Sequence, residues 1–303
     1  MKVGLCIPTR NPGAFANQQA SSIARQSLQP DVVLVIDSSS TDGSLDAYRN
    51  IGARVDTIDA ATFNHGGTRQ KGAELLDAEV IVFLTQDAIL ATPDSLQKLV
   101  ASFDDLSVGA AYGRQLARTG AGPIEVHARL FNYPAQGRTK SLEDKKALGI
   151  KTVFASNSFA AYRRVDLMQI GGFPSKLIMG EDSYVVAKML LAGKKIGYCA
   201  EATVFHSHDY SFAEEFRRYF DTGVFHARES WIRENFGYPQ GEGVRYVKSE
   251  LRYLAKENPF LIPSALVRNG LKLGAFKLGL LEARLPTFIK RRISMMRSYW
   301  PDQ

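Results

Sequence analysis

The stretch VIVFLTQD at residues 80–87 determines the fold class of this chain. Five apolar residues, three of them β-branched, are followed by three polar ones. A continuous apolar run of this length is typical of a strand buried on both faces in a parallel sheet. The same design recurs at Val32–Ile36, which ends at Asp37, and at Lys2–Ile7, which runs into Pro8-Thr9-Arg10.

Helical segments separate these runs, and this order predicts an α/β protein with a mainly parallel sheet and helices on both of its faces. Residues 114–150 are mixed in charge and interrupted by glycine and proline, so we expect a long loop region there. We expect one α/β domain over residues 1–240 and a basic helical region over residues 241–303. Helices are expected at Asn17–Ser27, Ser44–Ile51, His65–Leu76, Ser95–Phe103, Asp182–Leu191 and Phe212–Trp231, and further strands at Arg54–Ile58, Val108–Tyr112, Thr152–Phe154, Phe159–Tyr162 and Lys195–Cys199.

The net charge of the 303-residue chain, +7, is concentrated near its end. Residues 245–303 carry 12 Lys/Arg against 4 Asp/Glu, whereas 26 Lys/Arg and 27 Asp/Glu nearly cancel over residues 1–244. A basic segment indicates an anionic partner such as acidic lipid or phosphate, and no nucleic-acid-binding motif accompanies it. Cys6 and Cys199 make no disulfide framework and no metal-binding spacing, and we interpret them as core residues in a reducing compartment.

The basic tail also mixes charged and apolar residues. The apolar stretch after Met1 is cut short by Pro8, which argues against a signal peptide, and Pro259–Val267 is about half of the ~20 residues that span a bilayer. A basic amphipathic tail suits an anionic membrane surface, so we expect a cytoplasmic protein, peripheral at the inner face of the membrane. The alternative is a helix that packs on the main domain with a solvated basic face. One predicted face carries Leu266, Asn269, Leu273 and Phe276, the other Arg268, Lys272 and Lys277, and the end carries Lys290-Arg291-Arg292 and Tyr299-Trp300.

Acidic residues stand where two of the predicted strands end. Ligands of parallel sheets bind at the carboxyl ends of the strands. Asp37 is placed to accept hydrogen bonds from a base or ribose, although the Ser40 and Asp42 that follow are also ordinary helix caps. Asp87 is placed to hold a divalent cation, which prefers oxygen ligands.

Three further motifs add candidate residues. Asn64-His65-Gly66-Gly67-Thr68-Arg69 combines a helix start with a cation, a pattern that suits a diphosphate. Glu181-Asp182 opens a helix, where acids often only complement the dipole, but one of them could act as a general base. His206-Ser207-His208 follows a strand, and either histidine is a candidate metal ligand or a paired core residue.

Taken together, the ordered set resembles the inverting family-2 glycosyltransferases with the GT-A fold, over roughly residues 1–235. The matching pieces are Pro8-Thr9-Arg10, Asp37 with its Ser-Thr-Asp run, Gln86-Asp87, Gly171-Gly172-Phe173 and Glu181-Asp182. The stretches at residues 63–69, 85–88 and 206–208 look like the rhamnosyltransferase branch, which builds bacterial lipopolysaccharide core and O-antigen.

The resemblance implies a role for each matching position. Mg or Mn would be held by Asp87 with the help of His206, because Thr85 replaces the first acid of the family's Asp-x-Asp motif. Asp182, with Glu181 beside it, would be the base, and Phe154–Ser158, with Asn157 among them, and Phe173 would shape the acceptor or sugar pocket. The nucleotide donor, with dTDP-L-rhamnose favoured, would be bound by Pro8, Thr9, Arg10, Asp37, Asn64, Arg69 and Gln86.

Two other classes of function compete with a transferase that glycosylates a saccharide or glycolipid acceptor. One is a non-catalytic nucleotide-sugar-binding partner in a polysaccharide assembly complex, against which the complete set of acids and His206 argues. The other is a nucleotidyltransferase, which is expected to have a Gly-rich, Arg-containing loop after its first strand, unlike residues 8–13 here. A transferase that uses a UDP-sugar also remains open.

Overall fold

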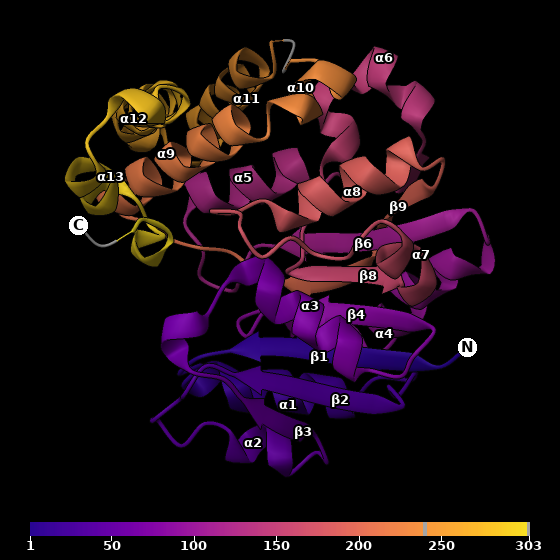
Figure 1. Ribbon diagram of the computed structural model, residues 1–303. Helices are drawn as coiled ribbons and strands as arrows, with labels where there is room; N and C mark the ends of the chain where they lie inside the picture. Colours follow the sequence, from indigo (N-terminus) through magenta and orange to yellow (C-terminus); the bar gives the residue numbers. More distant parts are fainter. Residues whose placement is uncertain (239–240, 302–303) are drawn as a thin grey trace.

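The structure, a computed structural model, describes residues 1–238 and 241–301, and these residues form a nine-stranded sheet between layers of helices (Figure 1). The strand order is β3-β2-β1-β4-β8-β6-β9-β5, and β7 pairs with β9. The strands are β1 (Val3–Thr9), β2 (Val32–Asp37), β3 (Arg54–Thr57), β4 (Val80–Leu84), β5 (Ile89–Leu90), β6 (Val108–Leu116), β7 (Arg138–Lys140), β8 (Phe159–Arg163) and β9 (Lys195–Phe205).

Most strands of the sheet run in one direction. β1 is parallel to β2 and β4, and β2 is parallel to β3. β8 is antiparallel to both β4 and β6, so β6 and its parallel neighbour β9 run the same way as β4. The arrow of β8 points against its neighbours in Figure 1. The predicted mainly parallel α/β architecture is confirmed.

Each face of the sheet carries its own core, because successive side chains of a strand point to opposite faces. Leu5 and Ile7 pack under α1 (Ala14–Ala24), α2 (Asp46–Arg49) and α4 (Ser95–Val100). Cys6 faces the other way, toward the core shared with α3 (His65–Leu75), α7 (Arg164–Gln169) and α8 (Glu181–Leu191). Cys6 is buried as expected, whereas Cys199 is only partly buried.

Two expectations about the middle of the chain are wrong. Residues 114–150 are not a long loop: β6 continues to Leu116 because it pairs with β9, and α5 (Pro123–Asn132), β7 and α6 (Lys145–Leu148) follow. Thr152–Phe154 is not a strand but lies at a 3-10 turn over Gly149–Val153. The Thr152 hydroxyl donates to the carbonyl oxygen of Gly149 at 2.7 Å, a local bond that a β-branched pattern does not reveal.

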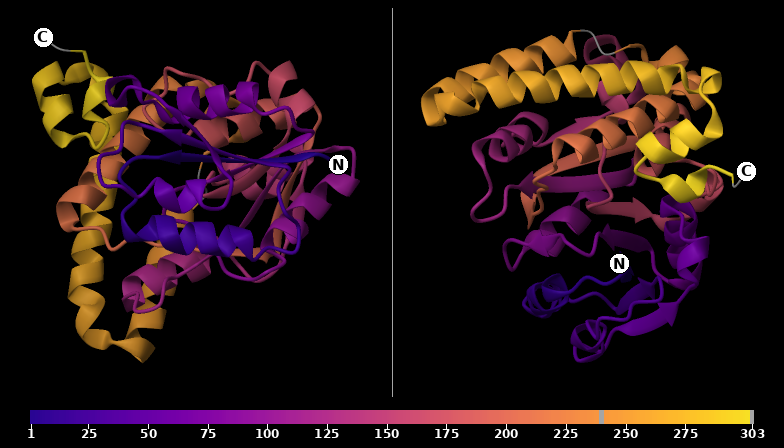
Figure 2. Two further views of the ribbon diagram at one scale, coloured as in Figure 1. Left: turned by 90° about the horizontal axis from the view of Figure 1, so that it is seen from below. Right: turned by 90° about the vertical axis from the view of Figure 1, so that its left-hand side faces the viewer.

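The C-terminal helices lie on one side of the sheet and include a long hairpin. They are α9 (Phe212–Arg228), α10 (Ser230–Phe236), α11 (Glu242–Glu257), α12 (Ile262–Leu280) and α13 (Thr287–Ile293). Figure 2 shows the orange and yellow hairpin of α11 and α12 reaching out beyond the sheet. Among the described residues, no helix has the length and apolar character that crossing a bilayer demands.

The predicted faces of the tail are wrong. Arg268 and Lys272 are not on a solvated face but pair with Glu215 of α9. Leu266 and Leu273 are exposed, unlike the half-buried Asn269 and Phe276 expected beside them. A helical wheel shows which residues share a face, but it does not show which face turns inward.

Helices α9 and α12 cross at a pair of glycines, and this contact generates a test of packing. A Cβ atom on Gly279 would lie 2.2 Å from the carbonyl oxygen of Phe220, and one on Gly223 would lie 2.2 Å from that of Phe276. We expect Gly279→Ala to lower the free energy of unfolding by about 1–3 kcal/mol in urea denaturation. Gly274→Ala is the control, because nothing lies within 4 Å of its Cβ position, and it should stabilise the helix by up to about 1 kcal/mol. Equal effects of the two substitutions would contradict the close crossing.

Candidate active site

The first part of the site is the edge where β1, β2 and β4 end. The Gln86 side-chain oxygen accepts hydrogen bonds from the Thr9 hydroxyl at 3.1 Å and from the backbone N–H of Arg10 at 2.6 Å. The backbone N–H of Ser38 donates to the carbonyl oxygen of Thr9 at 2.8 Å. The structure therefore brings Thr9, Arg10, Asp37 and Gln86 to one edge, as predicted from the strand ends.

The loops after β1 and β2 are held to each other by side chains. The Asn11 side-chain oxygen accepts from the backbone N–H of Thr41 at 2.8 Å, and Asp42 accepts from that of Gly13 at 2.9 Å. Asn11 and Ser39 have φ of 44° and 58°, a left-handed backbone that non-glycine residues rarely adopt. Asp37 itself accepts from the backbone and hydroxyl of Ser40, so its carboxylate orders this loop.

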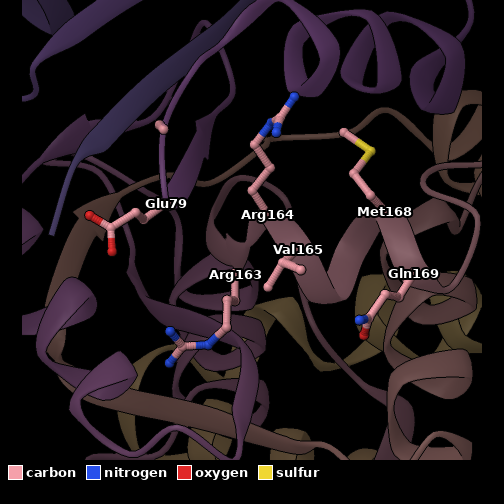
Figure 3. Close-up of a pocket in the computed structure, with 7 residues that line it drawn as sticks. Glu79, Arg163, Arg164, Val165, Met168 and Gln169 are labelled. Atoms are coloured by element: carbon pink, nitrogen blue, oxygen red, sulfur yellow. The ribbon is translucent and has the colours of Figure 1, made fainter.

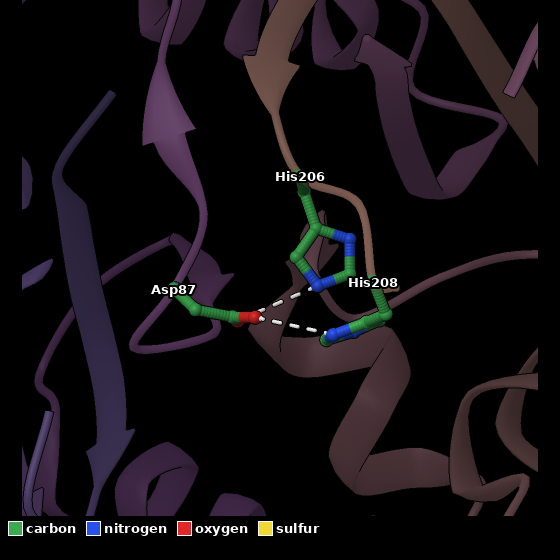
Figure 4. Close-up of side chains that lie close together, drawn as sticks. All are labelled: Asp87, His206 and His208. Carbon is green, nitrogen blue, oxygen red and sulfur yellow. Dashed lines mark ion pairs between the residues drawn. The ribbon is translucent and has the colours of Figure 1, made fainter. Parts of the chain in front are cut away.

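A cluster with metal-ligand chemistry lies beside these loops. One ligand atom each from Asp87, His206 and His208 lies within 4.8 Å of the others (Figure 4). Nε2 of His206 is 3.4 Å from Oδ1 of Asp87, and Nδ1 of His208 is 3.8 Å from Oδ2. The sequence left the choice between the two histidines open, and the structure brings both to Asp87.

The orientation of the His206 ring is set by residues that the sequence did not single out. Gln115 offers its side-chain oxygen to Nδ1 of His206 at 2.9 Å and to Nη1 of Arg129 at 2.9 Å. Since that oxygen can only accept, Nδ1 carries the proton and the lone pair of Nε2 faces Asp87. Two acceptors that face each other at this distance fit a cation between them, so the residues suit a divalent metal.

The charges around Asp87 keep it ionised. Burial alone raises the pKa of Asp87, but its interactions with His206, His208 and Arg118 outweigh burial, so this pKa lies well below its usual range. Nη2 of Arg118 is 3.0 Å from the Asp87 carboxylate. Burial lowers the pKa of His206, and it lowers that of His208 to about 3. Neutral imidazoles next to a carboxylate are the form in which these groups bind metals.

The two adjacent acids at the start of α8 have different surroundings. Glu181 is buried, 3.1 Å from Nη1 of Arg69, and it accepts from the Asn157 side chain at 3.0 Å. Asp182 is partly exposed, and burial together with the negative charge of Glu181 raises its pKa to about 6. Gly180 has φ of 80°, a left-handed conformation that lets α8 begin abruptly at these acids.

A single short segment joins the acids to the histidines. The backbone N–H of Asn157 donates to Oδ2 of Asp182 at 3.3 Å, and the Ser158 hydroxyl lies 3.5 Å from Nε2 of His206. Asn157 also accepts from the Tyr162 hydroxyl at 2.7 Å, which fixes its amide. Residues 156–158 therefore place the Asp182 carboxylate and the Asp87 cluster on neighbouring parts of one edge.

Three predicted residues lie deeper in the protein. Asn64 caps α3 by accepting from the backbone N–H of Gly67, and Phe173 packs edge-on against Phe83 and Tyr162. Arg69 is 4% exposed and paired with Glu181. The close approach that Gly66 permits is to the carbonyl of Pro174, where a Cβ atom would lie 1.9 Å away. The start of α3 is thus packed against the protein's own chain, and donor binding by Asn64 and Arg69 stays a prediction.

A separate open cavity of about 600 Å³ lies at the opposite edge of the sheet. Figure 3 shows Glu79, which directly precedes β4, together with Arg163, Arg164 and Met168. Arg163 donates to the carbonyl oxygen of Phe103 and Arg164 to that of Ala73. Since its cations already serve packing and it lies at the amino ends of the strands, this cavity is not part of the site.

The fold and the acid-rich carboxyl edge define a class, the glycosyltransferases of the GT-A type. The structure is similar to the mannosyltransferase PcManGT from Pyrobaculum calidifontis, solved with GDP-Man and Mn²⁺, with a TM-score of 0.59, 19% identity and coverage of 98% of this chain and 84% of that one. It is also similar to S. aureus TarS residues 1–349 solved with UDP-GlcNAc, with a TM-score of 0.55, 15% identity and coverage of 94% and 92%.

The chain belongs to glycosyl transferase family 2, whose family model matches residues 5–171. It is 49% identical to the O-antigen chain rhamnosyltransferase RfbN of Salmonella typhimurium, over 99% of this chain and 96% of that protein. It is 47% identical to the O-antigen chain rhamnosyltransferase WbaN of Salmonella anatum, over 98% and 95%. The family-2 resemblance and the glycosyltransferase class predicted from the sequence are confirmed.

The buried pair of Arg69 and Glu181 generates a stability test. Arg69→Met leaves the Glu181 charge buried without its cation, so we expect the free energy of unfolding in urea to fall by about 3–5 kcal/mol. The double variant Arg69→Met/Glu181→Gln removes both charges and should recover part of this loss. Arg54→Met breaks the exposed pair with Asp56 and should change stability by about 1 kcal/mol or less. A similar small effect of Arg69→Met would contradict a structural role for this pair.

Proposed function

We propose that this chain is an inverting rhamnosyltransferase that moves L-rhamnose from dTDP-L-rhamnose to a saccharide acceptor of the O-antigen, with Mg or Mn at Asp87. The sugar and the acceptor rest on the two O-antigen rhamnosyltransferases to which it is similar over nearly its whole length. The reaction rests on one geometric observation: the Asp182 carboxylate and the Asp87 cluster are joined through residues 156–158.

The proposed reaction is a single displacement. Asp182 takes the proton of the acceptor hydroxyl as that oxygen forms a bond to the anomeric carbon, and the bond from this carbon to the diphosphate breaks on the opposite face. Asp87, His206 and His208 would hold a divalent cation, which would supply positive charge to neutralise the leaving diphosphate. Arg118 is better placed than the buried Arg69 to add a second positive charge, because it is partly exposed beside Asp87.

The remaining residues bind the donor and shape the pocket. We assign Pro8, Thr9, Arg10, Asp37 and Gln86 to the nucleotide, because ligands of parallel sheets occupy the carboxyl ends of the strands. Arg10 and Gln86 are accessible there, whereas Pro8, Thr9 and Asp37 are buried at the strand ends. Asn157 positions both acids through its backbone and side chain, and Phe173 supports it from the core through Tyr162. We place this reaction in the cytoplasm, at a membrane that presents the acceptor.

Donor binding tests the nucleotide and the metal together. By calorimetry we expect dTDP to bind more tightly than UDP or GDP, and only with Mn²⁺ or Mg²⁺. Asp87→Asn should weaken metal-dependent binding more than about tenfold, because it removes the only carboxylate of the cluster. The matched control is Asp209→Asn. Asp209 is an exposed acid that directly follows His208, and this variant should bind dTDP and metal as the wild type does. Preference for UDP would contradict dTDP-L-rhamnose as the donor. Binding of none of the nucleotides would favour a different function.

The pH dependence of transfer tests the base. Asp182 must be ionised to accept a proton, so kcat should fall about tenfold per pH unit below the raised pKa of about 6. Asp182→Asn should lower kcat about 10²–10⁴-fold while donor binding persists. Glu181→Gln removes a negative neighbour, which lowers the pKa of Asp182 and should move the acid limb to lower pH. An unchanged acid limb in Asp182→Asn would remove this residue as the base.

A further inference from the structure

Helix α12 turns the charged side chains of Arg268 and Lys272 inward and several of its aliphatic side chains outward. Arg268 and Lys272 lie 3.1 and 3.2 Å from the buried Glu215 carboxylate, and Asn269 donates to the buried Glu250. The exposed residues recur at spacings of three and four, so they form one face. This outer stripe of α12 comprises Pro263, Leu266, Val267, Gly270, Leu273, Gly274, Lys277 and the C-cap residue Leu281.

The outer stripe is large, continuous and open to solvent. The four aliphatic side chains that dominate it, of Leu266, Val267, Leu273 and Leu281, are 47–57% exposed. The stripe is roughly 27 Å long at 1.5 Å per residue. Phe260, in the turn between α11 and α12, is 92% exposed. The hairpin that this turn closes projects from the rest of the protein in Figure 2. Single exposed apolar residues are ordinary, but a stripe of this length indicates a surface that binds something.

The charges around the outer stripe point to an anionic surface rather than to a second copy of the chain. Between Asn258 and Pro301 the only acid is Glu282, which is buried and paired with Arg228 and Lys290. The exposed charged residues of the same region are all cations, namely Lys277, Arg284, Arg292 and Arg297. A two-fold interface would bring this surface against itself and set cation against cation.

We propose that the outer stripe of α12 docks the protein on an anionic lipid bilayer. The leucines and Val267 enter the headgroup region, and Lys277 and Arg284, at the end of α12 and just after it, meet lipid phosphates. The last segment is not the anchor: Trp300 is 4% exposed, and Asp221 accepts from the backbone N–H groups of Met295 and Met296.

Docking through α12 also brings the catalytic edge to the membrane, and this part of the inference rests on the proposed function. Nη1 of Arg268 donates to the carbonyl oxygen of Tyr210 at 2.7 Å. Tyr210 lies in the same short segment as His206 and His208. This segment leads directly into α9, and α12 packs on α9. The segment that carries His206 and His208 is therefore attached to the helix that docks on the membrane.

Vesicle sedimentation of the full-length protein tests the surface. Wild type should bind vesicles of phosphatidylglycerol and phosphatidylethanolamine, and bind phosphatidylcholine vesicles much more weakly. Leu266→Glu/Leu273→Glu should reduce binding to the anionic vesicles more than about tenfold, since it places charge in the apolar contact. The matched control is Leu106→Glu/Val165→Glu, two exposed apolar residues outside the C-terminal helices, which should bind as wild type does. Lys277→Glu/Arg284→Glu provides a second, independent loss through charge.

Folding and donor binding are measured on the same variants. Unchanged thermal unfolding and dTDP binding in Leu266→Glu/Leu273→Glu, with vesicle binding lost, supports the proposal. Vesicle binding that persists in both α12 variants overturns it. The proposal is also overturned if the wild type forms a dimer and does not bind vesicles, and if Leu266→Glu/Leu273→Glu dissociates that dimer. Failure of wild type to bind any nucleotide would contradict the proposed function but leave the vesicle result intact.

Discussion

The reversal of one strand determines where the chemistry of this protein lies. Because β8 runs against β4 and β6, its beginning, not its end, lies at the carboxyl edge of the sheet. The residues that precede it, Asn157 and Ser158, are thereby brought beside the end of β4, where the carbonyl oxygen of Ser158 accepts from the backbone N–H of Thr85 at 3.3 Å. A parallel strand at this position would have sent the same residues to the opposite edge, away from Asp87 and Asp182.

The second determinant of the site is the difference in surroundings between two neighbouring carboxylates, those of Glu181 and Asp182. Glu181 is paired with Arg69 from α3, and burial together with the negative charge of Glu181 raises the pKa of Asp182. Buried ion pairs contribute little net stability compared with apolar packing, so such a pair is better understood by what it does to the groups around it. Here it ties α3 to α8 and leaves Asp182 as the acid that is accessible.

The strand ends were predictable because apolar runs such as Val80–Leu84 are visible along the chain, and the polar residues that follow them gather at one edge for geometric reasons. Gln115, Arg118 and Arg129 were missed because they lie in the stretch interpreted as a loop. Had the strand that starts at Val108 been continued to Leu116, Gln115 would have been recognised as a polar residue near its end. The pairing of Arg69 with Glu181 joins residues far apart in the sequence, and only the packing of α3 on α8 reveals it. The direction in which α12 turns its apolar face depends in the same way on its neighbours.

The crossing of α9 and α12 has a consequence for evolution. At Gly223 and Gly279 the two backbones touch, and even a methyl group would separate them. Such a contact fixes the rotation of α12 about its own axis as well as its position. The direction in which its outward leucines point is therefore determined by two residues that have no side chain. Substitutions of the outward residues can change the affinity of that surface without moving it. A substitution at either glycine would change the orientation of the whole outer stripe in one step.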